Sequence, residues 1–201
     1  GQIYKIQAYS RQAWHTEANL FLEWYVPYSS GRDAAPAAIQ EFQRLWDQAF
    51  DAIEGCGTGL VLRDYHSPNL IWLPDREGTD KIGLIDYQDA VIGPHAYDVA
   101  SLLLDARVDV SEALENELFE TYVKQRTNTD PDFDKVLFSA AYAVMGAQRI
   151  TKVMGIFVRL AERDGKPGYL AHMPRMKAYL DRVLQHPVLS ELKLWYEKTC
   201  S

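Results

Sequence analysis

In the middle of the chain, short apolar runs replace the helical periodicity that is visible on either side. Residues 70–73 and 82–85 are two such runs, and they flank a polar, turn-rich segment, residues 74–80. Apolar runs separated by turn residues predict a β-hairpin with a long loop. Residues 60–62 form a third short run. Because a hairpin of this size adds little to a hydrophobic core, the core must come from the segments around it.

The flanking segments carry apolar residues at helical spacing. One predicted helix spans residues 10–27, and another begins at Pro36 and ends near Gly55, because proline suits a first helical turn and glycine a C-terminus. Gly146 and Gly155 are candidate break points in a long helix after the hairpin. The helices predicted after the hairpin cover residues 97–106, 111–127, 132–163, 167–185 and 188–199, and their expected core positions include Leu114, Leu118 and Tyr122.

These patterns predict one domain, residues 1–201, of the α+β class: mainly α-helical, with a small embedded β-hairpin. An apolar content of 47% and a charged content of 24% exclude a disordered chain. The formal net charge is −7 without a basic stripe, which excludes a general nucleic-acid partner. An acidic balance also suits a cationic substrate, but a contribution to solubility is the favoured interpretation.

The location expected from the sequence is the cytoplasm. Cys56 and Cys200 are isolated thiols, which fits a reducing compartment without disulfides or a zinc ribbon. No apolar run approaches the roughly 20 residues that span a bilayer, so no membrane partner is expected. The first residues lack the apolar core of a signal peptide.

Polar residues are concentrated at both ends of the predicted hairpin. The stretch RDYHSPN, residues 63–69, directly precedes it, and DYQD, residues 86–89, directly follows it. Taken alone, the first stretch is also explained as an ordinary turn around Pro68, and the second as the start of a loop. Because the hairpin brings the two stretches together, we favour a functional site.

A register in which Leu70 faces Ile85 would place Asn69 opposite Asp86. Opposed residues of an antiparallel pair have Cβ atoms roughly 5 Å apart on one face, and an amide oxygen and a carboxylate at that distance can share a hard cation. Asp64 lies five residues before Asn69, so its carboxylate can lie beside the cation. Phosphoryl transfer needs such a set: one carboxylate to receive the proton of the attacking hydroxyl, and an Asn and an Asp to hold magnesium on the phosphates.

Asp64 and Asn69 match the kinase catalytic loop H-R-D-x-x-x-x-N, and residues 64–70, DYHSPNL, are similar to a D-x-H-P-x-N-L loop. Residues 85–90, IDYQDA, followed by residues 93–100, GPHAYDVA, are similar to an I-D-W-E-x-A…G-x-P-x-Y-D-L-A signature. Both patterns are typical of the aminoglycoside phosphotransferase and choline kinase superfamily, which the chain therefore resembles.

Further segments resemble bacterial sugar kinases of cell-wall recycling, which phosphorylate the anomeric hydroxyl of N-acetylmuramate and N-acetylglucosamine. These segments are residues 21–27 (FLEWYVP), 105–107 (DAR), 155–160 (GIFVRL) and 164–167 (DGKP). The resemblance implies an ATP-dependent phosphotransferase that uses Mg²⁺ and acts on a hydroxyl of a small molecule, in this case an amino sugar.

The resemblance also implies a role for each matching position. Asp64 would be the catalytic base, and Asn69 and Asp86 would bind Mg²⁺. His66 occupies the place from which kinases reach the phosphates, although a loop-packing histidine explains it equally well. The other implied positions are an apolar floor under adenine, Ile71 and Ile85, and a structural aspartate that hydrogen-bonds the catalytic loop, Asp98.

Two departures from the family pattern matter. Leu62 occupies a position where the family usually has a histidine that braces the loop. In addition, nothing before Tyr9 encodes the small β-rich lobe that covers the phosphates and supplies a lysine. The chain therefore resembles a protein-kinase-like C-terminal lobe whose partner is a missing N-terminal ATP-binding lobe. Alone it is expected to bind ATP very weakly and to show no useful turnover.

Other interpretations stay open. A kinase-fold interaction module without activity would explain the missing lobe, and a metal-dependent hydrolase would use Asp64, Asp86 and Asp89. The substrate is open as well, among amino sugars, aminoglycosides and amino alcohols. Surface or helix-capping roles are favoured for four polar residues that are also candidates for a substrate pocket: Asp89, Asp105, Gln148 and Arg149.

Overall fold

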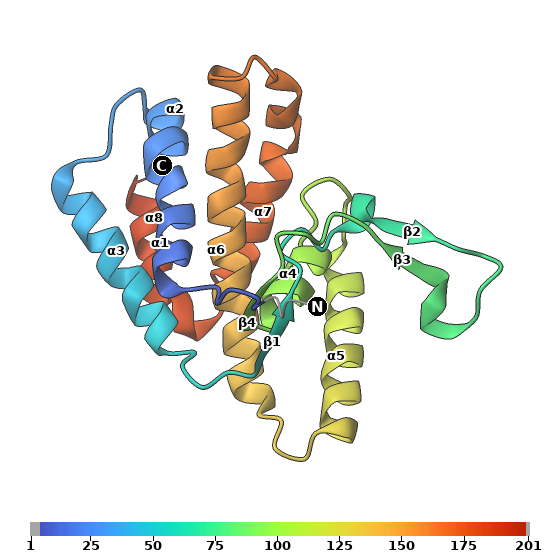
Figure 1. Ribbon diagram of the computed structural model, residues 1–201. Coiled ribbons are helices and arrows are strands. Elements are labelled where there is room, and N and C mark those ends of the chain that lie inside the picture. Colours follow the sequence, from blue (N-terminus) through green and yellow to red (C-terminus); the bar gives the residue numbers. More distant parts are fainter. Residues whose placement is uncertain (1–4, 200–201) are drawn as a thin grey trace.

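A long helix, α6 (Lys135–Glu162), organises the fold (Figure 1). The computed structural model describes residues 5–199. Within them, α1 (Arg11–Leu20), α4 (Ala96–Leu103) and α7 (Met173–Val183) all pack against α6. The body is mainly helical, as the sequence predicts.

The N-terminal helical stretch is longer than predicted. α1 continues through a π-helical turn, Phe21–Tyr25, into α2 (Val26–Ser30). The stretch ends at Gly31, whose φ of 71° is the left-handed conformation that glycine favours after a helix. α3 (Pro36–Asp51) begins at its proline, as predicted, and lies on the outer side of α1 in Figure 1.

Side-chain caps fix the beginnings of three helices. The Ser10 hydroxyl caps α1, the Ser111 hydroxyl caps α5 (Glu112–Thr129), and the Asp134 carboxylate caps α6. Each accepts a hydrogen bond from a backbone N–H group that the first helical turn leaves free. The last helix, α8 (Ser190–Thr199), follows a 3₁₀ turn and packs against α3.

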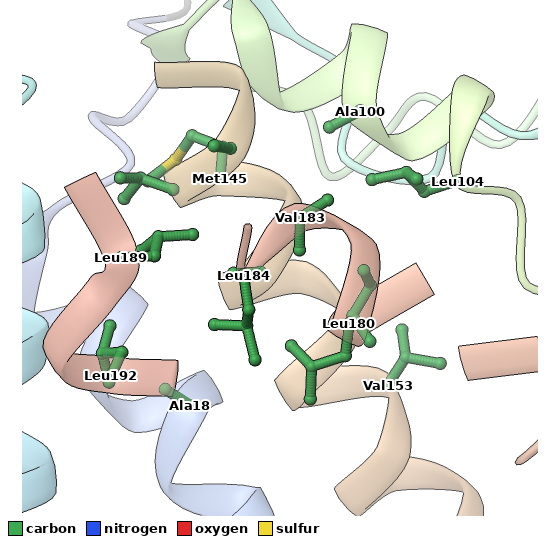
Figure 2. Packing of buried hydrophobic residues seen from close by; sticks show 14 of the residues in the cluster. Ala18, Ala100, Leu104, Met145, Val153, Leu180, Val183, Leu184, Leu189 and Leu192 are labelled. Carbon is green, nitrogen blue, oxygen red and sulfur yellow. The ribbon is translucent and has the colours of Figure 1, made fainter. Parts of the chain in front are cut away.

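The hydrophobic core lies where the helices meet (Figure 2). Burying one Leu, Val or Met side chain contributes about 1.5–3 kcal/mol, so this cluster accounts for much of the stability. The labelled side chains of the cluster are each at most 9% exposed: Ala18, Ala100, Leu104, Met145, Val153, Leu180, Val183, Leu184, Leu189 and Leu192.

α6 is unbroken, although the sequence offered Gly146 and Gly155 as break points. Both glycines instead allow close packing. A Cβ atom at position 146 would lie 2.9 Å from Leu104 Cδ1, and one at position 155 would lie 2.3 Å from the backbone oxygen of Leu20. Gly155 is therefore needed where α6 approaches the backbone at the end of α1, whereas at Gly146 the nearest atom belongs to a flexible side chain at the end of α4.

The predicted core face of α5 is wrong at two of its three positions, whereas the third, Tyr122, packs against the core. Leu114 and Leu118 are 42% and 40% exposed, whereas Glu115 is buried. The Tyr142 hydroxyl donates to Glu115 at 2.7 Å, and Arg182 lies 2.5 Å from its other oxygen. A buried carboxylate needs such partners, and they rotate α5 by one residue, about 100°, away from its apolar stripe.

Residues 5–199 contain two separate two-stranded antiparallel sheets, one more than predicted. β2 (Leu70–Trp72) and β3 (Ile82–Leu84) form the predicted hairpin. β1 (Thr58–Val61) pairs with β4 (Val91–Pro94). The sequence did not predict β4, because its VIGP composition includes glycine and proline, which are depleted in strands.

The hairpin register differs by one residue from the expected one. Leu70 pairs with Leu84, and the backbone N–H of Ile85 donates to the carbonyl of Asn69 at 3.2 Å. Asn69 therefore lies opposite Ile85 and not opposite Asp86. The physical reason is the long connection, which contains a 3₁₀ turn and does not set the register as a two-residue turn would.

The hairpin projects from the helical body and is not embedded in it (Figure 1). None of the residues of β2 and β3 is buried.

Cys56 is a free, half-buried thiol, and Cys200 lies outside the described residues. Across residues 5–199, no helix combines the length and the apolar character that crossing a bilayer requires.

A buried carboxylate, Glu17 of α1, connects three parts of the fold. It accepts hydrogen bonds from the Tyr9 hydroxyl and, at 3.2 Å, from Gln148 of α6. It also forms ion pairs with Lys152 of α6, at 3.0 Å, and with Arg63 of the loop after β1. Burial alone would raise the pKa of Glu17, but Lys152 and the hydrogen bonds outweigh burial and lower it. Glu17 is therefore charged at neutral pH.

Replacing Gly155 with alanine should lower the free energy of unfolding by about 1–3 kcal/mol. The added methyl group would collide with backbone atoms of Leu20 and Phe21, which cannot move away as a flexible side chain would. Urea unfolding measures the difference. Gly168→Ala is the matched control, because no atom lies within 4 Å of its Cβ position. A loss no larger than that of the control would contradict the close contact.

Glu17→Gln should lower the free energy of unfolding by about 3–5 kcal/mol, because it leaves Arg63 and Lys152 without their shared counter-charge. The folded-state pKa of Glu17 is lowered, so its stabilisation is fully present above the unfolded value of 4.5 and is lost as the pH falls through the folded value. Urea unfolding should show that the variant and the unaltered protein differ in free energy of unfolding by a constant amount above about pH 5. This difference should shrink as the pH falls further. Glu54→Gln, which changes an exposed glutamate, is the control. If the loss of stability in Glu17→Gln did not depend on pH, the charge of Glu17 would not be its cause.

Candidate active site

The loop that follows β1 is anchored by Asp98 of α4. The Asp98 carboxylate accepts hydrogen bonds from the backbone N–H groups of Leu62, at 2.6 Å, and Arg63, at 3.0 Å. Burial raises the pKa of Asp98, and the two hydrogen bonds only partly oppose it. The side chain that was expected to hydrogen-bond this loop thus lies against it.

Arg63 shapes the loop just before Asp64. Its φ of 67° lies in the left-handed region, which costs a non-glycine residue roughly 1–2 kcal/mol. The ion pair with Glu17 and the hydrogen bond to Asp98 hold Arg63 in this conformation. Asp64 follows with an exposed side chain, and its carbonyl oxygen accepts a hydrogen bond from Asn69 Nδ2 at 2.9 Å.

Asn69 and Asp86 lie together even though the register differs from the expected one. Asn69 Nδ2 is 3.4 Å from Asp86 Oδ2. The backbone of Asp86 explains this contact: its φ of 62° leaves the extended conformation, so its side chain turns back toward Asn69. Gln88 Nε2 donates to the other oxygen of the Asp86 carboxylate at 2.7 Å.

His66 is only 7% exposed, and Arg107 Nη1 donates to its Nε2 at 2.7 Å. Burial, together with the positive charges of Arg107 and Arg149, lowers the pKa of His66, so the ring is neutral at neutral pH. Asp105 supports this corner by accepting hydrogen bonds from the backbone N–H groups of Ser67, at 2.7 Å, and Arg107, at 2.8 Å. These contacts favour the loop-packing interpretation of His66, and its contact with a nucleotide stays a prediction.

The two small sheets expose many large apolar side chains. Ile71 and Ile85, the residues expected beneath adenine, are 43% and 47% exposed. The other large apolar residues here that are at least 40% exposed are Leu60, Trp72, Ile82, Leu84, Tyr87 and Ile92. Single exposed apolar residues are common, but this concentration is typical of a surface that binds a ligand or another part of a protein.

A cavity of about 150 Å³ lies between the Asp64 loop and α6; we call it the Asp64 cavity. Its lining includes residues from two of the segments that resemble sugar kinases, residues 105–107 and 155–160, so the fold brings these segments together. The residues that line the cavity include Asp64, His66, Arg107, Arg149, Lys152, Ile156 and Phe157. A second hollow shares Arg107 and Tyr169 with this cavity and adds Lys166 and His172.

Surface or capping roles were favoured for four polar residues, and the structure contradicts this for three of them. Asp105 and Gln148 are fully buried, and Arg149 is 5% exposed, whereas Asp89 is exposed. Asp105 accepts hydrogen bonds from the backbone of Ser67 and of Arg107, Gln148 binds Glu17, and Arg149 lines the Asp64 cavity. The signal for burial was present: Gln148 and Arg149 interrupt a long apolar stretch of α6.

A larger hollow, of about 500 Å³, lies between the π-helical turn, α7 and α8. The lining of this hollow does not include Asp64, Asn69 or Asp86. We therefore take the smaller Asp64 cavity as the candidate active site, because it adjoins the residues that can carry chemistry.

The arrangement suits phosphoryl transfer better than hydrolysis at a carboxylate metal centre. Within residues 5–199, no group of three or more His, Cys, Asp or Glu side chains is arranged to hold a metal ion, so a centre built from Asp64, Asp86 and Asp89 is not present there. An Asn–Asp pair holds Mg²⁺ together with phosphate oxygens and water. Asp64 borders the cavity and is tied to Asn69, so a hydroxyl in the cavity and a phosphate on the pair would meet beside Asp64.

The comparisons with known proteins agree with this chemistry. The sequence is 38% identical over 200 residues to N-acetylmuramate/N-acetylglucosamine kinase of Caulobacter vibrioides, covering 98% of this chain and 53% of that protein. A kinase of the same name from Pseudomonas putida is 37% identical over 181 residues, covering 88% of this chain and 51% of that protein. Another from Neisseria meningitidis is 36% identical over 179 residues, covering 87% of this chain and 52% of that protein. The chain spans about half the length of these curated relatives.

The family itself is identified by a match over residues 3–136, described as the phosphotransferase enzyme family. This range includes Asp64, Asn69, Asp86 and Asp98. The chain therefore belongs to the phosphotransferase enzyme family.

Proposed function

We propose that the complete protein transfers the γ-phosphate of ATP to a hydroxyl of an N-acetylated amino sugar, and that these residues form its kinase-like C-terminal lobe. One observation carries the proposal: Asp64 borders the cavity on one side and is connected through Asn69 to Asp86 on the other. Membership of the phosphotransferase family supports the use of ATP. The names of the relatives support the sugar.

In this proposal Asp64 is the general base. As the hydroxyl oxygen of the sugar forms its bond to the γ-phosphorus, the bond between that phosphorus and the bridging oxygen of ADP breaks. The proton of the hydroxyl passes to the Asp64 carboxylate. Because the protein would form no covalent intermediate, catalysis depends on how the backbone contacts of Asp64 with Asn69 and Leu62 position the carboxylate.

Asn69 and Asp86 would hold Mg²⁺ on the phosphates. An amide oxygen and a carboxylate are hard ligands of the kind that this ion prefers. The amide nitrogen of Asn69 faces the Asp64 carbonyl and Asp86, which leaves the amide oxygen available as a ligand. Gln88 orients the carboxylate of Asp86 through its hydrogen bond. Bound Mg²⁺ neutralises the charge that develops on the transferred phosphoryl group.

The exposed apolar residues of the hairpin would form the nucleotide side. Ile71 and Ile85 would lie beneath the adenine ring, with His66 behind the loop. The curated relatives have about twice the length of this chain, and kinases cover the phosphates with a β-rich lobe. We propose that such a lobe covers the hairpin in the complete protein, and that the present residues alone bind ATP very weakly.

N-acetylmuramate and N-acetylglucosamine are the proposed acceptors. The first carries a carboxylate on an ether-linked side chain and the second does not; we call them the carboxylate sugar and the neutral sugar. Aminoglycosides and amino alcohols are cationic, and they fit less well with a cavity lined by Arg107, Arg149 and Lys152.

Asp64→Asn in the complete protein should lower kcat for sugar phosphorylation about 10²- to 10⁴-fold, because asparagine cannot accept the proton. Release of ADP, measured with either sugar, gives the rate. Asp89→Asn makes the same change on a nearby exposed side chain and should leave kcat nearly unchanged. An unchanged rate in Asp64→Asn would remove this residue from the mechanism. If the unaltered protein phosphorylates neither sugar, an inactive interaction module becomes the better interpretation.

Asp86→Asn should raise the Mg²⁺ concentration for half-maximal activity at least about tenfold, because it removes the only negative charge of the Asn69–Asp86 pair. Titration of activity with Mg²⁺ at saturating ATP measures the shift. Asp80→Asn, in the exposed hairpin loop, is the control. A Mg²⁺ requirement that is identical in the two variants would show that Asp86 does not bind the ion.

A further inference from the structure

Arg149 is a buried cation whose donors are not all used. It lies near the middle of α6, is 5% exposed, and its Nε and Nη1 have no hydrogen-bond partner among the described residues. Within residues 5–199, no carboxylate lies at ion-pair distance from it. An unpaired charge in the interior is strongly unfavourable, so this side chain points to a ligand.

The neighbouring cations have partners that Arg149 lacks. Lys152, on the same helix, is 3.0 Å from the carboxylate of Glu17. Arg107 donates to His66 at 2.7 Å. Lys152 therefore has a counter-charge, and the exposed Arg107 has a neutral partner and solvent around it, whereas Arg149 is buried without either.

The surroundings of Arg149 offer no free counter-charge. Asp64 is the one carboxylate among the described residues that line the cavity, and it is exposed to solvent. Asp98 and Asp105 lie close by, but backbone N–H groups occupy both of their carboxylates. Asp98 attracts Arg149 through space, but its carboxylate is not at ion-pair distance. A molecule that enters the cavity thus meets N–H donors of Arg149 that no protein anion occupies.

Arg149 also lies on the side of the acceptor and not on the side of the phosphates. The cavity that it lines is bordered by Asp64, but neither Asn69 nor Asp86 contributes to its lining. An arginine that stabilised the nucleotide phosphates would be expected beside the Asn–Asp pair. The ligand of Arg149 is therefore the molecule that supplies the hydroxyl.

We propose that Arg149 binds a carboxylate of the acceptor substrate inside the Asp64 cavity, while the reacting hydroxyl of the same molecule lies at Asp64. This inference rests on the proposed function. A carboxylate supplies both acceptor oxygens and negative charge, whereas water would satisfy the N–H donors but leave the charge unpaired. The apolar side chains of Ile156 and Phe157 in the same lining exclude water and strengthen such a charge pair.

Steady-state phosphorylation of both sugars by the complete protein tests this inference. Arg149→Gln should lower kcat/KM for the carboxylate sugar about 10- to 100-fold, mainly through KM. The neutral sugar should be affected much less, and KM for ATP should not change. Arg44→Gln, which removes an exposed arginine of α3, is the charge-matched control. Equal losses for the two sugars, or a raised KM for ATP, would overturn the inference.

A second test uses the unaltered protein and does not depend on the folding of a variant. Calorimetry without ATP compares the binding of the carboxylate sugar with that of its methyl ester, which has a similar shape but no charge. The ester should bind at least about tenfold more weakly. Equal binding of the acid and the ester would overturn the role of Arg149. Failure to phosphorylate either sugar would instead overturn the proposed function, so the two outcomes are distinguishable.

Discussion

The charge of Glu17 is the interaction on which the geometry of the site depends. A buried carboxylate must have compensating partners, and Glu17 finds them in Lys152 of α6 and in Arg63, the residue before Asp64. The same carboxylate therefore joins α1 to α6 and fixes the loop that presents Asp64. The packing of the helical body and the position of the candidate base are determined together, although the two lie far apart in the sequence.

Two non-glycine residues in left-handed backbone conformations, Arg63 and Asp86, border the site. Each conformation costs roughly 1–2 kcal/mol, and each is compensated locally. Asp98 accepts the backbone N–H of Arg63, and Gln88 donates to the side chain of Asp86. Conformations of this kind persist where the surrounding structure enforces them and are concentrated at functional sites. Here they have a definable effect, because they orient the side chains at both ends of the hairpin.

The helical body was predictable because its apolar residues recur at the helical period. The polar stretches beside the hairpin could be recognised because they interrupt that pattern. Periodicity failed where a tertiary contact decides the outcome. Glu115 is buried by its contacts with Tyr142 and Arg182, which no local pattern reveals. Asn69 and Asp86 do come together, but through the left-handed backbone of Asp86 and not through the expected register.

α6 contributes side chains both to the core and to the lining of the Asp64 cavity. Met145 and Met154 are buried in the core, whereas Arg149 and Ile156 line the cavity. Because one closely packed helix carries both sets, folding of the body also positions the side chains that would contact an acceptor. The hairpin differs, because it projects from the body and none of its strand residues is buried. On the proposed function, this lobe thus provides a preformed acceptor cavity, while the geometry of the nucleotide side depends on what covers the hairpin.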